Sequence, residues 1–498
     1  MLGNDRVFKI SPNDSVAILL EPIKKGEYVN SGNALICVRE DIDVRHKISI
    51  EGIKVGENVI KYGMPIGHAS RDIAPGEFVH THNVKTNLDG LVDYSYSPKF
   101  NAHTQISGVE TFWGYIRENG EIGIRNEIWI INTTGCVNKT AETLARLAMQ
   151  KFAGKTGGIY SFAHPYGCSQ LGNDHLCTQR ILADLVKHPN AAGVLVLSLG
   201  CENNNLEEFK EVIGDQYQNR VKFMVAQDVS DEIETGLDLI EQLVEYSQCF
   251  KRERISVSKL KVGLKCGASD GFSGITANPL VGVFSDKLIA NGGTVLLSEV
   301  PEMFGAEKIL MERCADGEVF EKTVKLINDF KKYFLKYNQK IYENPSPGNK
   351  KSGISTLEEK SLGCVQKGGT SVIVDVLRYG DRATKTGLNL LEASGNDIIT
   401  QTALTAAGAH VILFTTGNGN PLGAPVPTVK ISSNTDLAIR KKEWVDFNAG
   451  QLLEGKSMEH LTKELFSYIL DLASGEIQTK NEKNGYREIS IFKDGVIL

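Results

Sequence analysis

The chain contains the run Ala192-Gly193-Val194-Leu195-Val196-Leu197-Ser198-Leu199, and this stretch decides the fold class. Its valine and leucine residues are nearly continuous, with no regular alternation of polar side chains. A strand that is covered by helices on both faces, as in a parallel sheet, has this appearance. The run therefore predicts a buried strand of a parallel sheet.

The segments around this run alternate between strand and helix patterns. Ile128–Thr133 and Ile159–Ala163 are strand-like, and helical periodicity follows each of them, over Asn138–Phe152 and Asp174–Lys187. A second series begins at the strand-like Val262–Lys265 and continues toward the C-terminus. Alternation of this kind predicts an α/β protein with two units, each a parallel sheet with helices on both faces.

The first ninety residues follow a different pattern. Ile23–Val29 recurs as Ile53–Val59 and as Ile73–Val79, and each copy carries a Gly-Glu pair at a turn before a strand-like segment. Helical periodicity is nearly absent, so this region predicts a small all-β module, followed by a polar linker. The predicted domains are 1–95 for the module, 96–107 for the linker, 108–252 for the central α/β unit and 253–498 for the C-terminal α/β unit.

The composition is that of an ordinary globular protein, with 41% hydrophobic and 23% charged residues among 498. The net charge of −6 argues against nucleic acid as a partner, and no apolar run approaches the roughly 18–20 residues of a membrane span. The N-terminus lacks the apolar stretch of a secretory signal, so we expect a cytoplasmic protein. Nine cysteines scattered through a long chain are expected to be reduced thiols.

Four cysteines stand beside glycines where predicted strands end, namely Cys136, Cys168, Cys201 and Cys266. Open α/β sheets bind ligands at the carboxyl ends of their strands, and thiolates are good ligands for iron or zinc. The ordinary alternative is that each cysteine is a small buried hydrophobic residue. Because all four share this position, we favour metal binding, with Asp270 and Glu299 as oxygen ligands from neighbouring strand ends.

Histidines and cations supply candidate acid, base and carboxylate-binding groups. His80 and His82 are two residues apart, so a strand would place both imidazoles on one face. An exposed polar strand end would show the same pattern. His164 flanks the loop that carries Cys168. Three cations near glycine-rich motifs could hold an anionic carboxylate: Lys61, Arg125 and Lys367.

Six irregular segments stand out in the chain: Lys61–Gly67, Gly135–Asn138, Tyr166–Gly172, Leu199–Asn203, Ser269–Pro279 and Tyr342–Asn349. Together they resemble the altronate and galactarate dehydratase family, in unbroken order from about residue 8 to the C-terminus. Ser169–Gly172 and Glu302–Glu307 resemble the altronate branch of that family. One departure is Ala268, where members of the family usually carry a second glycine.

The resemblance implies an N-terminal β-clip module of the SAF type, a central dimerisation domain and a C-terminal Rossmann-like variant. It also implies a hydro-lyase that converts D-altronate into 2-dehydro-3-deoxy-D-gluconate and water. The implied cofactor is Fe²⁺, or Mn²⁺ in its place, under reducing conditions. We therefore expect a homodimer whose partner molecule is a small sugar acid.

Dehydration of a 2,3-dihydroxy acid removes the C2 proton and expels the C3 hydroxyl, and a divalent metal on the carboxylate would stabilise the enediolate. We expect the metal ligands among Cys168, Cys201, Cys266, Asp270 and Glu299. The expected acid, base and electrostatic groups are His80, His82, His164 and Lys61. The expected substrate-binding residues are Arg125, Asn203, Ser269 and Lys367.

Other functions stay open at this point. A dehydratase for galactarate or another sugar acid would use the same chemistry. An iron–sulfur hydro-lyase would use the cysteines to hold a cluster, although no compact cysteine run of the ferredoxin type is present. A non-catalytic sugar-acid binding protein would leave the strand-end thiols unexplained. A zinc-dependent oxidoreductase lacks a dinucleotide fingerprint, because Gly417–Gly423 is followed by Pro425 and Pro427 instead of a helix.

Overall fold

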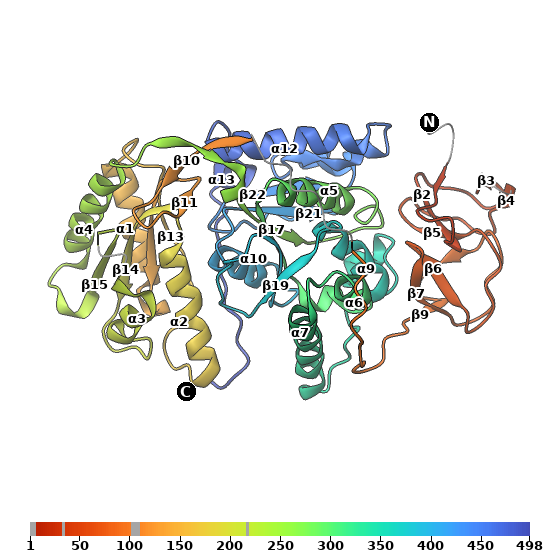
Figure 1. The fold of residues 1–498 in the computed structure, drawn as a ribbon, viewed down its shortest axis with the longest axis horizontal. Coiled ribbons are helices and arrows are strands. Elements are labelled where there is room, and N and C mark those ends of the chain that lie inside the picture. Colours follow the sequence, from red (N-terminus) through yellow and green to blue (C-terminus); the bar gives the residue numbers. More distant parts are fainter. Residues whose placement is uncertain (1–5, 32–34, 101–109, 216–218) are drawn as a thin grey trace.

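The computed structural model describes residues 6–31, 35–100, 110–215 and 219–498. Three parts lie in a row in Figure 1: the N-terminal module (residues 7–85) at the right, the C-terminal domain (261–484) in the middle and the central domain (127–247) at the left. Among the described residues, no helix is both long and apolar enough to cross a membrane.

Short antiparallel strands build the N-terminal module, as the sequence predicts. Each copy of the repeat turns at its glycine, with φ of 85° at Gly26, 84° at Gly56 and 85° at Gly76. Glycine adopts this left-handed conformation without the steric penalty of a Cβ atom. The strands pair in the orders β1-β2-β5-β8, β3-β4 and β6-β7-β9. They are β1 (Val7–Phe8), β2 (Val16–Leu19), β3 (Tyr28–Asn30), β4 (Leu35–Cys37), β5 (Lys47–Ser49), β6 (Asn58–Lys61), β7 (Met64–Ala69), β8 (Phe78–Val79) and β9 (Val84–Lys85).

The segment after the module runs along the C-terminal domain. The hydroxyl of Tyr96 donates to the carbonyl of Cys314 at 2.9 Å, and Lys99 pairs with Glu312 at 3.0 Å. The predicted linker, 96–107, is therefore anchored over residues 96–100, and its remainder lies outside the described residues.

The central domain is a parallel sheet in the order β13-β12-β14-β15, and this confirms the predicted strand-and-helix alternation. All eight residues of β14 are buried. Its alternate side chains enter different cores, with Val194 and Val196 on one face and Leu195 and Leu197 on the other. The elements are β12 (Glu127–Asn132), α1 (Asn138–Lys151), β13 (Ile159–Ser161), α2 (Gly172–Lys187), β14 (Ala191–Ser198), α3 (Leu206–Ile213), β15 (Val221–Val225) and α4 (Glu232–Ser247).

A small antiparallel sheet joins the central and C-terminal domains. It consists of β11 (Ile122–Gly123), β10 (Thr111–Ile116) and β16 (Arg252–Ser256), in that order. The predicted boundary between residues 252 and 253 thus falls inside β16, which pairs with the strand that precedes the central domain.

The C-terminal domain is built on a seven-stranded parallel sheet in the order β19-β20-β18-β17-β21-β22-β23. The strands β18, β19 and β20 lie on one side of β17, and the later strands β21, β22 and β23 lie on the other side, so the order reverses between β17 and β21. Open α/β sheets bind ligands at such a point, outside the carboxyl ends of the strands. The strands are β17 (Lys261–Cys266), β18 (Thr294–Leu297), β19 (Ile373–Leu377), β20 (Gly387–Leu391), β21 (Val411–Thr416), β22 (Thr428–Ser432) and β23 (Phe447–Asn448).

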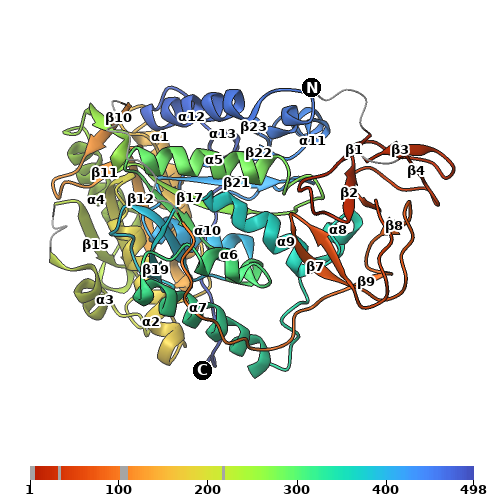
Figure 2. The same cartoon turned by 45° about the vertical axis from the view of Figure 1, so that its right-hand side comes forward.

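Helices cover both faces of this sheet, and one of them also contacts the module. Figure 2 shows α9 (Leu357–Cys364) beside β7, and the two elements are in contact. All eight residues of α9 are buried, so it lacks the amphipathic pattern by which a helix is recognised in a sequence. The other helices are α5 (Ala277–Ala290), α6 (Glu307–Met311), α7 (Gly317–Lys336), α8 (Pro347–Lys351), α10 (Asp397–Ala406), α11 (Thr435–Arg440), α12 (Met458–Ser474) and α13 (Lys480–Asn484).

Candidate active site between the module and the C-terminal domain

A buried charge cluster joins the module to α9. The carboxylate of Glu359 accepts hydrogen bonds from Nζ of Lys47 at 2.8 Å and from Nζ of Lys61 at 2.6 Å. All three side chains are at most 2% exposed. Burial disfavours each charge, but the opposite charges outweigh it at Glu359, whose pKa is lowered, and at Lys61, whose pKa is raised. Burial dominates at Lys47 and lowers its pKa to about 8.

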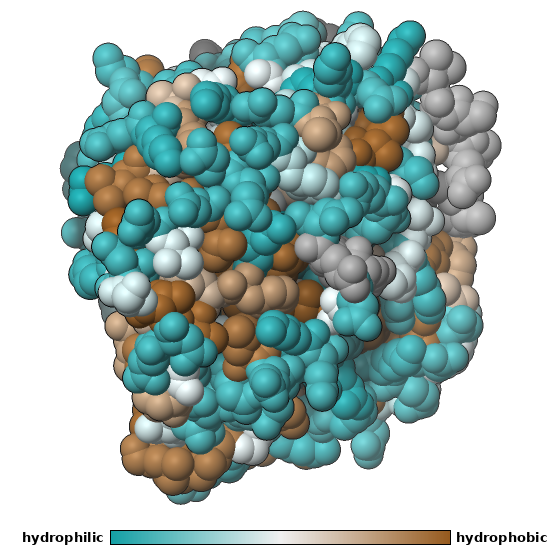
Figure 3. Space-filling view, turned by 90° about the vertical axis from the view of Figure 1, so that its left-hand side faces the viewer, coloured by the Kyte–Doolittle hydropathy of each residue, from teal (hydrophilic) through white to brown (hydrophobic). Residues whose placement is uncertain are grey.

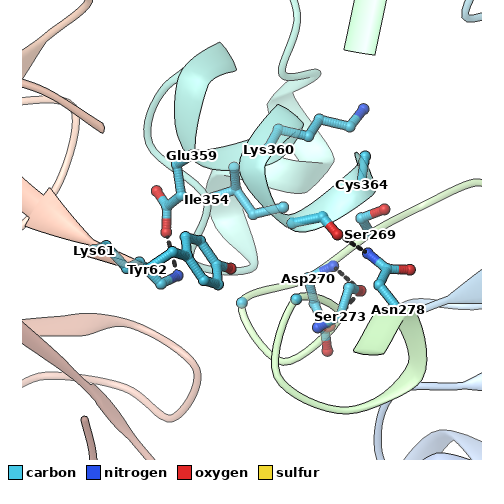
Figure 4. A pocket seen from close by; sticks show the side chains of 13 residues that line it. Lys61, Tyr62, Ser269, Asp270, Ser273, Asn278, Ile354, Glu359, Lys360 and Cys364 are labelled. Atoms are coloured by element: carbon cyan, nitrogen blue, oxygen red, sulfur yellow. Dashed lines mark hydrogen bonds and ion pairs between the residues drawn. The ribbon is translucent and has the colours of Figure 1, made fainter. Parts of the chain in front are cut away.

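A narrow pocket opens beside this cluster, with walls from the module, α9 and the loop after β17 (Figure 4). Lys61 and Tyr62 line this pocket, and Nζ of Lys61 lies over the Tyr62 ring, 4.9 Å from its centroid. The hydroxyl oxygen of Ser269 is buried and has no hydrogen-bond partner, so it is available to a ligand. The lining residues are Lys61, Tyr62, Ser269, Asp270, Gly271, Ser273, Gly274, Asn278, Ile354, Glu359, Lys360, Gly363 and Cys364.

The loop after β17 is held by Asp270. Its carboxylate accepts hydrogen bonds from the backbone N–H and hydroxyl of Ser273, both at 2.9 Å, and from the hydroxyl of Ser433 at 2.7 Å. Arg45 of the module lies 3.5 Å from the same carboxylate. Ala268 has a φ of 54°, a left-handed conformation that is uncommon for residues with a Cβ and that glycine adopts more easily. Asp270 therefore positions the loop, and its role as a metal ligand stays a prediction.

Cys266, Glu302 and Cys364 form a compact buried group. Both thiols donate to Oε2 of Glu302, Cys266 at 3.0 Å and Cys364 at 3.1 Å, and the two sulfur atoms are 3.3 Å apart. The hydrogen bond with Cys266, together with burial, raises the pKa of Cys364. Within the described ranges, this is the one group of three such ligand atoms that lie within 4.8 Å of one another. Two thiols and a carboxylate can hold an ion such as iron or zinc.

Lysines surround this group. Nζ of Lys360 lies 2.8 Å from Oε1 of Glu302, and Nζ of Lys367 lies 3.0 Å from Oε2 of Glu299. Lys265 also pairs with Glu299. Burial would raise the pKa of Glu302, but these lysines outweigh it and lower that pKa below its usual range. Glu302 therefore stays ionised, and the surrounding lysines favour an anionic substrate.

The structure corrects the predicted placement of His80 and His82. β8 ends at Val79, and His80–Asn83 forms a turn that is closed by the bond from the backbone N–H of His80 to the side chain of Asn83 at 2.9 Å. The two imidazoles therefore do not share a strand face, and His82 is exposed. The ring of His80 lies 5.4 Å from that of His46. Burial, followed by the charge of Lys47, lowers the pKa of His80 to about 4.

The predicted residues of the central domain do not reach the pocket. His164 is buried, and its Nε2 lies 3.0 Å from the carbonyl of Asn132. Cys168, Cys201 and Asn203 are exposed at the ends of the central sheet. Their strands belong to a different sheet from the strand that ends at Cys266, so the fold does not gather Cys168 and Cys201 with Cys266.

Arg125 and Lys367 were expected to bind the substrate carboxylate, and both are engaged with protein groups. Arg125 is 7% exposed and donates to both carboxylate oxygens of Glu482, at 2.7 and 3.1 Å. Lys367 is 1% exposed and pairs with Glu299, beside the buried group of Cys266, Glu302 and Cys364. Only Lys61 and Ser269, of the residues expected to contact substrate or act in catalysis, line the pocket.

Three residues of α9 belong to the site although the sequence reasoning gave them no role: Glu359, Lys360 and Cys364. Glu302 was likewise absent from the predicted ligands. One signal was present, because Gly363-Cys364 repeats the Gly-Cys pairing of the strand-end motifs. From the sequence Cys364 was ambiguous, and in the structure it ends a helix and not a strand.

Models of one protein family match three consecutive parts of the chain. The altronate/galactarate dehydratase SAF domain matches residues 5–87. The second domain of D-galactarate dehydratase/altronate hydrolase matches residues 114–248, and the C-terminal domain of D-galactarate/altronate dehydratase matches residues 257–497. The three matches follow the order of the module, the central domain and the C-terminal domain.

Curated relatives match over nearly the whole length. The chain is 52% identical over 497 residues to an altronate dehydratase of Bacillus subtilis, covering 98% of this chain and 99% of the relative. It is 51% identical over 492 residues to an altronate dehydratase of Escherichia coli, with the same coverage. It is 31% identical over 512 residues to the galactarate dehydratase (L-threo-forming) of Escherichia coli, covering 97% and 96%. The chain therefore belongs to the altronate/galactarate dehydratase family.

Proposed function

We propose that this chain is a hydro-lyase that converts D-altronate into 2-dehydro-3-deoxy-D-gluconate and water. The identity to two altronate dehydratases over nearly the full length supports this substrate. The structural observation that carries the proposal is the pocket that places Lys61 and Lys360 beside the buried group of Cys266, Glu302 and Cys364. The 31% identity to a galactarate dehydratase keeps galactarate as the competing substrate.

Cys266, Glu302 and Cys364 would hold a ferrous ion. Thiolate ligands favour iron over manganese, which prefers oxygen ligands, so we propose Fe²⁺ in preference to Mn²⁺. When bound, the ion would supply a Lewis acid for the substrate carboxylate. Of the ligands expected from the sequence, Cys266 is in this group and Glu299 is beside it, with Oε1 at 3.7 Å from Sγ of Cys266.

The protein's own residues would bind the substrate and move its protons. Glu359 raises the pKa of Lys61, so this lysine stays an ammonium and can hold the substrate carboxylate without acting as a base. His80 is neutral at pH 7, because its pKa is about 4. A neutral imidazole can accept the C2 proton, and because His80 does not line the pocket, this role requires the substrate to extend beyond the pocket toward His80. His82 remains the candidate acid, and His164 has no role in this scheme.

The test is anaerobic incubation of the purified protein with D-altronate, Fe²⁺ and a thiol reductant, following formation of the 2-keto-3-deoxy acid. Galactarate and D-mannonate are parallel substrates. We expect product from D-altronate alone, loss of product with a chelator, and recovery when Fe²⁺ is added back. Product from another sugar acid alone would keep the hydro-lyase chemistry and reject the substrate.

Two cysteine variants locate the metal. Cys364→Ala removes a proposed ligand, whereas Cys314→Ala is the matched control, because Cys314 is equally buried but its thiol faces Thr323 at 3.3 Å. We expect Cys364→Ala to lower the Fe²⁺-dependent activity by roughly 100-fold or more, a larger effect than the 10–100-fold typical of groups around a metal's ligands. Equal activity in the two variants would show that Cys364 does not bind the catalytic metal.

Further features stay proposals. We assign the module to the β-clip class and the C-terminal sheet to the Rossmann-like class, and we propose a cytoplasmic homodimer joined through the central domain. Met149, Leu171 and Leu176 of that domain are exposed, and Figure 3, which faces that end of the molecule, shows apolar patches between the polar ones. Exposed apolar patches of this kind support association with a second copy.

A further inference from the structure

Three cysteines of the central domain occupy matching positions at the ends of three adjacent strands. β12 and β14 pair with Asn132 opposite Leu197, and Cys136 and Cys201 each lie four residues beyond that pair. β13 lies on the other side of β12, and Cys168 follows it seven residues after Ser161. Parallel strands end at the same edge, so all three thiols are carried to one edge of the sheet.

Backbone hydrogen bonds tie the three loops together. The N–H of Gly135 donates to the carbonyl of Tyr166, and the N–H of Asn204 donates to the carbonyl of Gly167, both at 2.9 Å. Glu202 binds the end of its own strand through the N–H of Gly200 at 2.6 Å. Its other oxygen accepts from the hydroxyl of Thr133, after β12. The loops therefore form one rigid surface.

The glycine before each cysteine is required by this close packing. A Cβ on Gly135 would lie 2.6 Å from the carbonyl oxygen of His164, and one on Gly200 would lie 2.7 Å from Oε1 of Gln227. A Cβ on Gly167 would collide with the carbonyl of Thr133. The Gly-Cys pairs thus bring three backbones together while the cysteine side chains stay exposed and outside any disulfide.

The three thiols are too far apart to bind one tetrahedral ion together. A tetrahedral zinc site with bonds of about 2.3 Å needs sulfur atoms closer than about 4 Å. Among the described residues only Cys266, Glu302 and Cys364 form a group within 4.8 Å, so at least one pair among the Cys136, Cys168 and Cys201 sulfurs is farther apart than that. A four-iron cluster bonds each thiolate to a different iron, and it therefore accepts wider spacing.

The position in the sheet also favours a ligand. The central sheet has the order β13-β12-β14-β15. The chain passes from β12 to β13 on one side and from β14 to β15 on the other, so the strand order reverses between β12 and β14. This is the point at which open α/β sheets bind ligands, and Cys136 and Cys201 end the two strands that flank it. We propose that Cys136, Cys168 and Cys201 hold a four-iron, four-sulfide cluster, separate from the buried group of the C-terminal domain, with one iron left without a protein thiolate.

The test is anaerobic reconstitution of the purified full-length protein with Fe²⁺ and sulfide, followed by desalting. Acid-labile sulfide, iron and the visible sulfide-to-iron absorption are measured. We expect about four sulfides per chain in the wild type. The triple variant Cys136→Ala, Cys168→Ala, Cys201→Ala is expected to retain none, with an unchanged far-ultraviolet circular dichroism spectrum. The sulfide measurement reports only the cluster, whereas the iron measurement would also include an ion bound at Cys266.

Matched variants make the result decisive. Cys249→Ala removes another exposed cysteine of the chain, outside this edge, and Cys364→Ala alters the buried group. Both are expected to keep the full sulfide content. The proposal is overturned if the wild type retains no labile sulfide, if the triple variant retains as much, or if Cys364→Ala alone abolishes it. If the triple variant unfolds, the single variants Cys136→Ala and Cys201→Ala decide, since each is expected to lose most of the visible absorption.

Discussion

Replacing Glu359 by glutamine removes the carboxylate that Lys47 and Lys61 share, while the side chain keeps its shape. Both lysines are buried, and neither has another carboxylate of the described residues within 4 Å. Lys47 retains a hydrogen bond to the carbonyl of Gly353 at 2.7 Å. The module is joined to α9 through this cluster, so we expect the variant to weaken the module strands β5 and β6 more than the rest of the molecule.

The magnitude follows from the burial of the two charges. Breaking a buried ion pair by removing one partner costs about 3–5 kcal/mol. A buried lysine can instead lose its proton. At about 1.36 kcal/mol per pH unit, neutralising a lysine of ordinary pKa near 10.4 costs about 4.6 kcal/mol at pH 7. Both routes place the loss in the free energy of unfolding at about 3–5 kcal/mol.

The same reasoning gives the sign of the pH dependence. In the variant, a neutral folded Lys61 has a lower pKa than in the unfolded chain, so the folded state binds fewer protons and its stability rises with pH. Between pH 7 and pH 9 the Lys61 contribution to the deficit should shrink by about 2.7 kcal/mol, because wild-type Lys61 stays charged at both values, and Lys47, whose wild-type pKa is about 8, adds to this change.

The assay is amide hydrogen exchange with mass spectrometry on peptides that cover β5 and β6, with β14 as the internal reference. Asp41→Asn is the matched control, because the Lys24–Asp41 pair lies in the same module but both side chains are more than 60% exposed. We expect no measurable change there. An unchanged opening free energy in Glu359→Gln at pH 7, or a deficit that stays constant to pH 9, would refute the reasoning.

Three further predictions concern other groups. Burial lowers the pKa of His80 in the folded protein, so stability should fall as the pH drops from 6.5 toward 4, and His80→Asn should lessen that fall in a series of melting temperatures. Arg125→Met should lower the free energy of unfolding by about 3–5 kcal/mol, because Arg125 pairs with buried Glu482, and it should leave KM for D-altronate unchanged. A raised KM with normal stability would instead support a role of Arg125 in substrate binding. Ser269→Ala should raise KM several-fold with little loss of stability, because the buried hydroxyl has no protein partner to lose; an unchanged KM would separate this hydroxyl from the substrate.

Much of the fold could be read from local patterns. The predicted strand at Ala192–Leu199 corresponds to β14, and the predicted helix at Asn138–Phe152 corresponds to α1. Glu299, expected at a strand end, lies two residues beyond β18, which ends at Leu297, and it has a φ of 70°. α9 was missed for a different reason, since a helix that is buried all round shows no periodicity.

The candidate site was predictable only in part. Cys266 was found because it ends a strand, and Ser269 and Lys61 were found through the motifs around them. Cys364 was ambiguous, and its thiol meets that of Cys266 across 98 positions of the chain. The hydrophobic periodicity of a sequence cannot predict such a contact, because the contact depends on how α9 packs between the sheet and the module.

The sequence by itself determined the strand segments, the glycine turns of the module and the presence of thiols at strand ends, because each of these depends on local conformation and burial. Only the tertiary structure decided that the thiols divide between two separate sheets. Cys266 joins Cys364 and Glu302 in one domain, whereas Cys136, Cys168 and Cys201 line the edge of a separate sheet. The physical reason is that sheet order and domain packing arise from contacts between distant residues, and these contacts decide which strand ends meet.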